Sequence, residues 1–246
     1  MTYEHLIVER EDNIAVVTIN RHERRNALAE KTLQELDAAF TELGADGEVR
    51  AVVITGAGGK AFCAGADLEE GFEATEDNIR AIVEGGQKVF QKIENFPKPV
   101  VAAVTGYAFG GGFELMLSCD ISVAEENATM GQPEILRGLM PGWGGTQKIP
   151  RIAGKNRAME IMLLGARYRA PELASMGLVN RVAPRGEGLK AAKEIAAKLA
   201  KQPSGAMALI KQAVLAGEGD DLEKGLKVEA ENFAKAFMVS EWNKGK

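Results

Sequence analysis

The chain has 246 residues, of which 46% are hydrophobic and 26% charged, a composition ordinary for a globular enzyme. Its net charge is −5 at neutral pH, so nothing suggests a surface that binds polyanions, and we expect no nucleic-acid partner. No run of about 18 uncharged apolar residues occurs, so we expect no membrane span.

Cysteine and histidine are scarce. The two cysteines, Cys63 and Cys119, form no CxxC pair, and there are only two histidines. This usage argues against a disulfide framework and a zinc site, and we expect no metal. The N-terminal segment MTYEHLIVERED is charged and lacks the apolar stretch of a secretory signal. We therefore expect a cytoplasmic protein.

Strand and helix patterns alternate from the N-terminus onward. The runs HLIVER and IAVVTIN predict two short strands, and apolar residues at helical spacing predict a helix over 29–43. The apolar run VRAVVITG predicts a strand buried on both faces, and the glycine-rich GGKAFCAGADLEE after it is typical of a loop. A second amphipathic pattern predicts a helix over 75–95, which Pro97 and Pro99 end before the next strand, in FPKPVVAAVTG.

The pattern changes in the last quarter of the chain. A short helix through Leu117 and a strand in DISVAEE continue the alternation, which predicts a layered α/β core. After GLVNRVAP the sequence is rich in Lys, Ala and Glu and is almost wholly helical in pattern. We therefore divide the chain into a core over 1–187 and a helical region over 188–246.

The segment GYAFGGGFELMLSCD, residues 106–120, places three glycines immediately before a glutamate. The glycines give the backbone freedom that no side chain allows, or let another group approach it closely. Glu114 then stands between Phe113 and Leu115, in a run that is otherwise apolar. A carboxylate is almost never buried without a partner, so Glu114 is a candidate functional residue.

A second glutamate occupies a similar setting. In GQPEILRGLMPGWGGTQ, Glu134 follows Pro133 and precedes another glycine cluster. Taken alone, Glu134 suits the exposed first turn of a helix, and Glu114 alone suits a helix face in water. Two glutamates beside glycine-dense segments favour a pair for proton transfer, with one carboxyl ionised and the other protonated.

Other catalytic and nucleotide-binding motifs are weak or missing. GAGGKA, residues 56–61, matches the dinucleotide pattern but opens no clear helix, so a nicotinamide site is not expected. The sequence contains neither GxxxxGK[ST] nor GxSxG. The glutamate pair is the stronger candidate.

Three long motifs carry a family resemblance. AFCAGADL, GYAFGGGFELMLSCD and GQPEILRGLMPGWGGTQ, in this order and spacing, resemble the enoyl-CoA hydratase (crotonase) family, and the resemblance extends from INRHERRNAL to residues 174–182. It implies an α/β fold, a crotonase-like spiral of ββα units with a C-terminal helical region that builds homotrimers, usually paired into hexamers. It also implies an acyl-CoA substrate of the kind used in fatty-acid β-oxidation, with CoA as part of the substrate and no separate cofactor.

The resemblance assigns roles to individual residues. The backbone N–H groups of Ala66 and Gly111 correspond to the donors that hold the thioester oxygen. Glu114 corresponds to the group that takes a proton from water, and Glu134 to the group that protonates the α-carbon. Because hydratases of the family carry both glutamates, the resemblance implies addition of water across the 2,3 double bond of a trans-2-enoyl-CoA. It implies further contacts with the substrate or its CoA for Ala27, Ala64, Gly65, Asp67, Leu68, Gly110, Gly142 and Trp143.

Several alternatives stay open. The chain could be another acyl-CoA enzyme of the family: an isomerase, a 3-hydroxyacyl-CoA dehydratase, or a hydratase for branched or cyclic acyl groups. It could also be a non-catalytic relative used for binding, although the intact glutamate pair argues against this. Arg24 or Arg25 is a candidate phosphate contact. The candidate walls of the acyl pocket are Phe72, Phe113, Met140 and Trp143.

Overall fold

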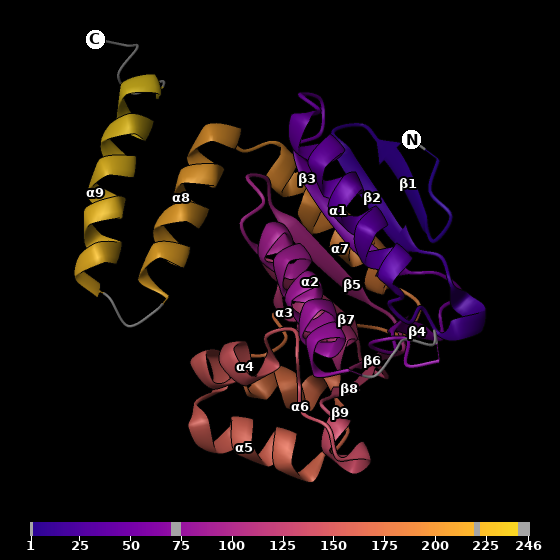
Figure 1. The fold of residues 1–246 in the computed structure, drawn as a ribbon. Helices are drawn as coiled ribbons and strands as arrows, with labels where there is room; N and C mark the ends of the chain where they lie inside the picture. Colours follow the sequence, from indigo (N-terminus) through magenta and orange to yellow (C-terminus); the bar gives the residue numbers. More distant parts are fainter. Residues whose placement is uncertain (1, 70–74, 219–221, 241–246) are drawn as a thin grey trace.

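Two sheets of unequal size organise the computed structural model, which describes residues 2–69, 75–218 and 222–240 (Figure 1). The larger has six strands in the order β1-β2-β3-β5-β7-β10. Only the β1–β2 pair is antiparallel, and the other pairs of this sheet are parallel. Its strands are β1 (Leu6–Glu11), β2 (Ile14–Ile19), β3 (Ala51–Gly56), β5 (Val100–Val104), β7 (Ile121–Glu125) and β10 (Arg181–Ala183).

The smaller sheet has four strands in the order β4-β6-β8-β9. They are β4 (Ala61–Cys63), β6 (Tyr107–Phe109), β8 (Thr129–Gly131) and β9 (Tyr168–Arg169). The predicted loop over GGKAFCAGADLEE is therefore wrong at β4, which pairs with β6 in parallel. Strands of two or three residues are too short for a periodic pattern, which is why the sequence did not reveal this sheet.

The chain alternates between the two sheets and so builds a spiral. The pairs β3–β4, β5–β6 and β7–β8 each put their first strand in the large sheet and their second in the small one. Helices α2 (Glu76–Glu94) and α3 (Gly111–Leu117) follow the first two pairs. This repeated strand–strand–helix order confirms the predicted spiral of ββα units.

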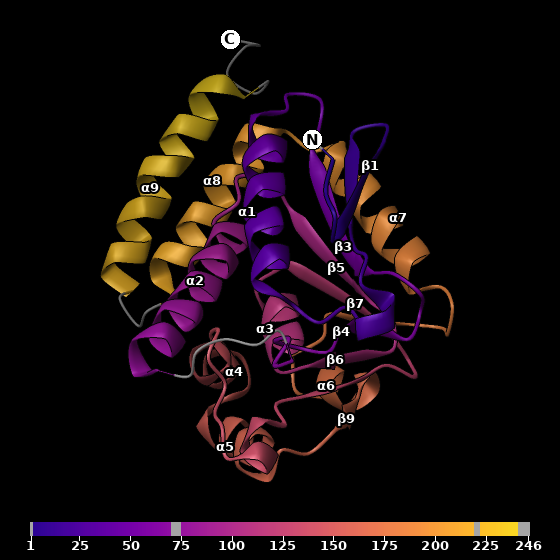
Figure 2. The same ribbon diagram turned by 45° about the vertical axis from the view of Figure 1, so that its right-hand side comes forward.

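Helices cover both faces of the large sheet (Figures 1 and 2). On one face, α1 (Glu30–Ala45) and α2 pack over the main core. Leu36, Phe40 and Leu43 of α1 are fully buried there, as their spacing predicts. On α2, the side chain of Thr75 accepts a hydrogen bond from the Asn78 N–H and so starts the helix. These helices match the two that the sequence predicts, to within two residues at each end.

The C-terminal helices divide into two parts. Helix α7 (Gly188–Ala200) covers the other face of the large sheet and shares a second core with β2, β3, β5 and β7. Helices α8 (Ser204–Gly217) and α9 (Leu222–Val239) pack against each other in a hairpin that stands out from the body (Figure 1). The division of the chain near residue 187 stays a prediction. None of the helices in the described ranges is long and apolar enough to cross a membrane.

The remaining elements lie at one end of the large sheet. They are the short 3₁₀ turns η1 (His22–Arg24) and η2 (Glu134–Arg137), and the helices α4 (Gly145–Ala153), α5 (Lys155–Leu164) and α6 (Ala170–Ser175). Both predicted glutamates lie in this region, Glu114 in α3 and Glu134 in η2.

Candidate active site

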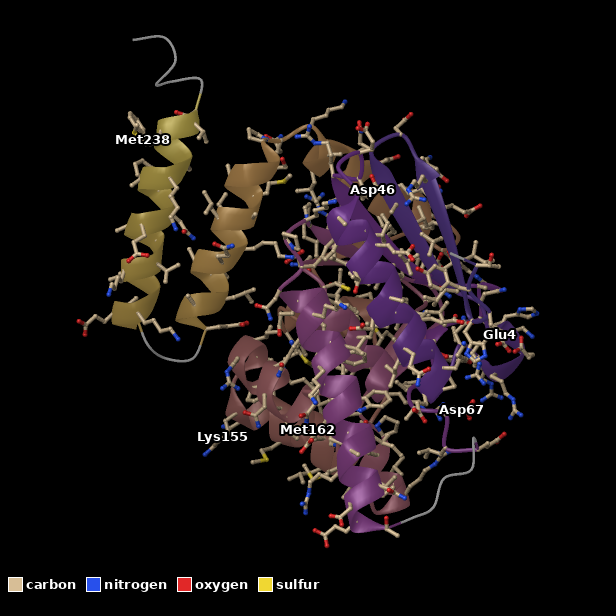
Figure 3. The ribbon with its side chains drawn as sticks, turned by 45° about the horizontal axis from the view of Figure 1, so that its top comes forward. Glu4, Asp46, Asp67, Lys155, Met162 and Met238 are labelled. Atoms are coloured by element: carbon tan, nitrogen blue, oxygen red, sulfur yellow. The ribbon has the colours of Figure 1, made fainter. Side chains whose placement is uncertain are left out.

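A cleft of about 2200 Å³ opens between α2, the start of α3 and the segment from η2 to α4. Glu114 and Glu134 both line it, as do Ala66 and Gly111. Figure 3 labels Asp67, another lining residue, on the body of the molecule and away from the hairpin that carries Met238. The predicted catalytic and oxyanion residues, which span 69 positions of the sequence, are thus brought to one cavity.

Glu114 is buried and held by backbone groups. Its side chain, in the first turn of α3, is only 1% exposed. Oε1 accepts hydrogen bonds from the N–H of Trp143, at 2.9 Å, and of Gly145, at 2.7 Å. Burial raises the pKa of Glu114 to about 7, and the charge of Glu134 adds to this, while the two N–H groups and Lys148 oppose it. The carboxyl can therefore change its protonation state near neutral pH.

Glu134 lines the same cleft, at the first position of η2. Its carboxyl is close to the glycine run, since a Cβ built on Gly110 would lie 2.8 Å from Glu134 Oε1. Gly110 has φ +53°, a left-handed conformation that favours glycine. Both this backbone conformation and the nearby carboxyl of Glu134 therefore require a residue without a side chain. Partial burial also raises the pKa of Glu134.

Gln132 contacts Glu134, and the sequence did not single it out. It is fully buried. With its amide nitrogen facing Glu134, the orientation that its hydrogen-bonding neighbours favour, Nε2 lies 2.9 Å from Oε1 and 3.2 Å from Oε2. A Cβ on Gly145 would meet both Gln132 and Glu114, so the amide also lies next to the first glutamate. The sequence offered only the position of Gln132, two residues before Glu134, because its burial and its contact appear only in the fold.

Two backbone N–H groups at the cleft, those of Ala66 and Gly111, have no backbone acceptor among residues 2–69, 75–218 and 222–240. Among the backbone hydrogen bonds of the described residues, neither the Ala66 nor the Gly111 amide donates, although both neighbours of Ala66 take part in a bridge to Leu28. The amides are close together, because a Cβ on Gly111 would lie 3.6 Å from the Ala66 nitrogen. The Gly111 amide is also at the N-terminus of α3, where first-turn N–H groups have no partner in the helix. Such a pair suits an oxygen that gains negative charge.

Buried polar contacts hold the loop that carries Ala66. Asn26 is fully buried in the left-handed region, at φ +57°, and its amide nitrogen donates to the carbonyls of Ala57 and Ala61. Arg21 pairs with Asp67 at 2.8 Å and donates to the Ala27 carbonyl. This network joins the segment before α1 to the loop after β4.

The other predicted substrate contacts divide by position. Ala27 is buried in this network and does not line the cleft. Asp67 lines it, but its carboxylate is paired with Arg21. The remaining predicted contacts all line the cleft: Ala64, Gly65, Leu68, Gly110, Gly142 and Trp143.

The predicted acyl-pocket walls and phosphate contacts also differ in placement. Met140 and Trp143 line the cleft, whereas Phe113 is fully buried in the core and does not border it. Phe72 lies outside the described residues. Of the two candidate arginines, Arg25 lines the cleft, and Arg24 pairs with Glu69.

Metal ligands are not grouped in the part of the chain that the structure describes: no three His, Cys, Asp or Glu side chains there could hold an ion. The cleft instead combines two carboxyls with two unused N–H groups. The first can move protons, and the second can stabilise an oxyanion.

Comparisons with known proteins agree with this arrangement. The family model for enoyl-CoA hydratase/isomerase matches residues 9–246. The chain is 42% identical to a short-chain-enoyl-CoA hydratase of Clostridium acetobutylicum, over 98% of this chain and 92% of that protein. It is 39% identical to a crotonyl-CoA hydratase of Syntrophomonas wolfei, covering 100% and 94% of the two chains. The crystal structure of an enoyl-CoA hydratase from Bacillus anthracis superposes with a TM-score of 0.93 at 36% identity, covering 98% and 94%. The chain therefore belongs to the enoyl-CoA hydratase/isomerase family.

Proposed function

We propose that the protein is an enoyl-CoA hydratase that adds water to the 2,3 double bond of a trans-2-enoyl-CoA by means of Glu114 and Glu134. The family and the hydratase names of relatives at 39–42% identity support the activity. The observation that carries the mechanism is the presence of both carboxyls on one cleft, beside two N–H groups for which the described part of the chain supplies no backbone acceptor.

In this mechanism the N–H groups of Ala66 and Gly111 hold the thioester oxygen. As water adds to the β-carbon, electrons of the double bond move toward the α-carbon and the thioester carbonyl. The resulting negative charge on oxygen is stabilised by donors already in place, a contribution typically of about 10²–10³-fold in rate for one donor.

The two carboxyls carry out the proton transfers of the hydration, one as base and one as acid. Ionised Glu114 takes a proton from the water as its oxygen bonds to the β-carbon, and protonated Glu134 delivers a proton to the α-carbon. Burial raises the pKa of both groups, that of Glu114 to about 7, so Glu114 can take up and release a proton near neutral pH. In our proposal Gln132 orients the carboxyl of Glu134 through its amide nitrogen.

The CoA part of the substrate contacts the loop after β4 in this proposal. Ala64, Gly65 and Leu68 provide this surface, with Gly110 and Gly142 nearer the thioester. We propose that the reaction needs no cofactor beyond the CoA that the substrate carries. Asp67 and Ala27 act indirectly, because their contacts to Arg21 fix the loop.

The hairpin of α8 and α9 supports a proposal of self-association into trimers or pairs of trimers. Its exposed large apolar residues are Ile210, Val214, Leu222, Leu226, Phe233, Phe237, Met238 and Val239. A surface of this kind marks an interface rather than a solvated face. Closed rings of identical subunits are the usual outcome for such interfaces.

We also place the protein in the cytoplasm. Cys63 is buried and Cys119 half-buried, and both are free thiols. Free thiols suit a reducing compartment.

Incubation of the purified protein with crotonyl-CoA tests the activity. Loss of the absorbance of the conjugated thioester, with 3-hydroxybutyryl-CoA as product, is the expected result. An isomerase would instead convert 3-butenoyl-CoA to the conjugated thioester without hydrating it. A protein that binds crotonyl-CoA but leaves it unchanged would contradict the proposal and favour a binding role.

A further inference from the structure

We infer that Trp143, seated against Gly86 of α2, closes the acyl end of the cleft and restricts the enzyme to short enoyl groups. The inference rests on the proposed hydratase function and adds the residue that selects the substrate within that class. The relatives named for short-chain and crotonyl substrates are consistent with it.

The indole occupies space that two glycines leave open. A Cβ on Gly86 would lie less than 3.0 Å from three atoms of the indole, Nε1, Cε2 and Cδ1. A Cβ on Gly111 would lie less than 3.0 Å from Cε3 and Cζ3, on the other edge of the ring. Trp143 is therefore wedged between the middle of α2 and the start of α3.

Gly86 destabilises helix α2, and its presence there is explained by the space that the indole needs. A glycine inside a helix is less favourable than alanine by about 1 kcal/mol. The neighbouring Gly85 has nothing within 4 Å of a built Cβ, so space does not require glycine there. Gly86 is buried, and only glycine leaves room for the ring. The two residues thus form a matched pair across the cleft wall.

The ring has little freedom to swing aside. Trp143 is 6% exposed, and its ring meets Phe90 of α2 edge to face, with centroids 5.5 Å apart and planes at 72°. Its own backbone N–H donates to Glu114. Moving the residue would disturb the catalytic carboxyl as well as the packing, so we treat the indole as a fixed wall.

The position of this wall relative to the reacting atoms decides its effect. One edge of the indole touches the glycine whose N–H holds the thioester oxygen, and the backbone of the same residue holds Glu114. Acyl carbons beyond the double bond must therefore pass beside the ring toward α2. There, Val83 of α2 lies next to Gly142, 3.5 Å from where a Cβ of that glycine would be, so α2 and this segment approach each other beside the ring.

A substrate panel tests the inference. We would measure kcat/KM for crotonyl-, trans-2-hexenoyl-, trans-2-octenoyl- and trans-2-decenoyl-CoA with the wild type and with Trp143→Ala. The wild type is expected to prefer crotonyl-CoA to octenoyl-CoA by at least about 10-fold, the discrimination that a closed apolar pocket gives for added methylenes. Trp143→Ala is expected to raise the octenoyl-to-crotonyl ratio by at least about 10-fold.

Phe90→Leu is the matched control. Phe90 touches the indole but does not line the cleft, so this variant loosens the same cluster without removing the wall. Its ratio of octenoyl to crotonyl should stay that of the wild type. Trp143→Leu serves in place of the alanine variant if that variant does not fold, because it keeps an apolar side chain while shortening the wall.

A binding measurement separates selection from chemistry. Calorimetric titration with saturated octanoyl-CoA and butyryl-CoA needs no turnover, and only the tryptophan variants should gain affinity for octanoyl-CoA. Equal wild-type kcat/KM on crotonyl- and decenoyl-CoA, or an unchanged ratio in both tryptophan variants, would overturn the inference while leaving the hydratase function intact. No hydration of any substrate by the wild type would instead overturn the proposed function, and with it this inference.

Discussion

Replacing Glu114 by glutamine should separate catalysis from stability. The glutamine amide keeps one carbonyl oxygen, which can still accept from the N–H groups of Trp143 and Gly145. It cannot take a proton from water. We expect kcat on crotonyl-CoA to fall at least about 10²-fold, which corresponds to roughly 2.7 kcal/mol of transition-state stabilisation.

The same substitution should stabilise the fold at alkaline pH. The folded carboxyl holds its proton up to a pKa of about 7, whereas its ordinary value is 4.5. Wild-type stability is therefore lost as pH rises from 4.5 through 7, because the unfolded chain releases this proton first. The shift corresponds to roughly 3 kcal/mol, and at 1% exposure solvent screens little of it. Glu114→Gln has no such loss.

Urea denaturation at pH 5 and pH 8 measures this effect, alongside initial rates with crotonyl-CoA. The advantage of the variant in free energy of unfolding should grow by up to about 3 kcal/mol between these pH values. Glu134→Gln is the comparison, since its partly buried carboxyl should give a smaller gain with a similar loss of rate. A stable variant with near wild-type kcat would refute the catalytic role. If the difference in free energy of unfolding between Glu114→Gln and the wild type did not change with pH, the proposed effect of burying Glu114 would be refuted.

Further predictions address the oxyanion donors, the pH profile and assembly. In a Trp143→Ala background, where the ring next to Gly111 is gone, Gly111→Pro should lower kcat about 10²–10³-fold, and normal turnover by the folded double variant would exclude that N–H. The value of kcat/KM should fall with decreasing pH around pH 7, because Glu114 becomes protonated there. Lys148→Met should move this fall to higher pH, because Lys148 lowers the pKa of Glu114. Arg151→Met, a substitution of an exposed residue, should not move it. Light scattering should give about three or six times 26.3 kDa, and Phe233→Asp on α9 should shift the mass downward. A wild type at the monomer mass across micromolar concentrations would contradict the assembly proposal.

Long periodic elements were predictable from the sequence, and short ones were not. The helix pattern over 75–95 gave α2 to within one residue at each end, since Thr75 and Asn95 are its caps. The strands β4, β6, β8 and β9 escaped, because two or three residues carry no period and their pairing depends on partners far along the chain.

The candidate site shows the same division. Glu114 and Glu134 could be named because each stands in a long motif, and the structure brings both to the cleft. The contact of Trp143 with Gly86 could not be predicted, because it joins residues 57 positions apart whose local patterns are independent. Gln132 could not be predicted for another reason. The role of a side-chain amide depends on the groups to which it hydrogen-bonds, and these are known only from the fold.

The buried Asn26 network has a consequence for the energetics of substrate capture. Arg21 pairs with Asp67 of the loop that carries Ala66, and Asn26 in the same segment before α1 donates to the carbonyls of Ala57, just after β3, and Ala61, at the start of β4. The conformational entropy of this loop is therefore lost when the chain folds rather than when the thioester arrives. Binding free energy that would otherwise order the loop remains for holding the ligand. Asn26→Ala should accordingly weaken capture of a non-reacting acyl-CoA, although Asn26 lies outside the cleft lining.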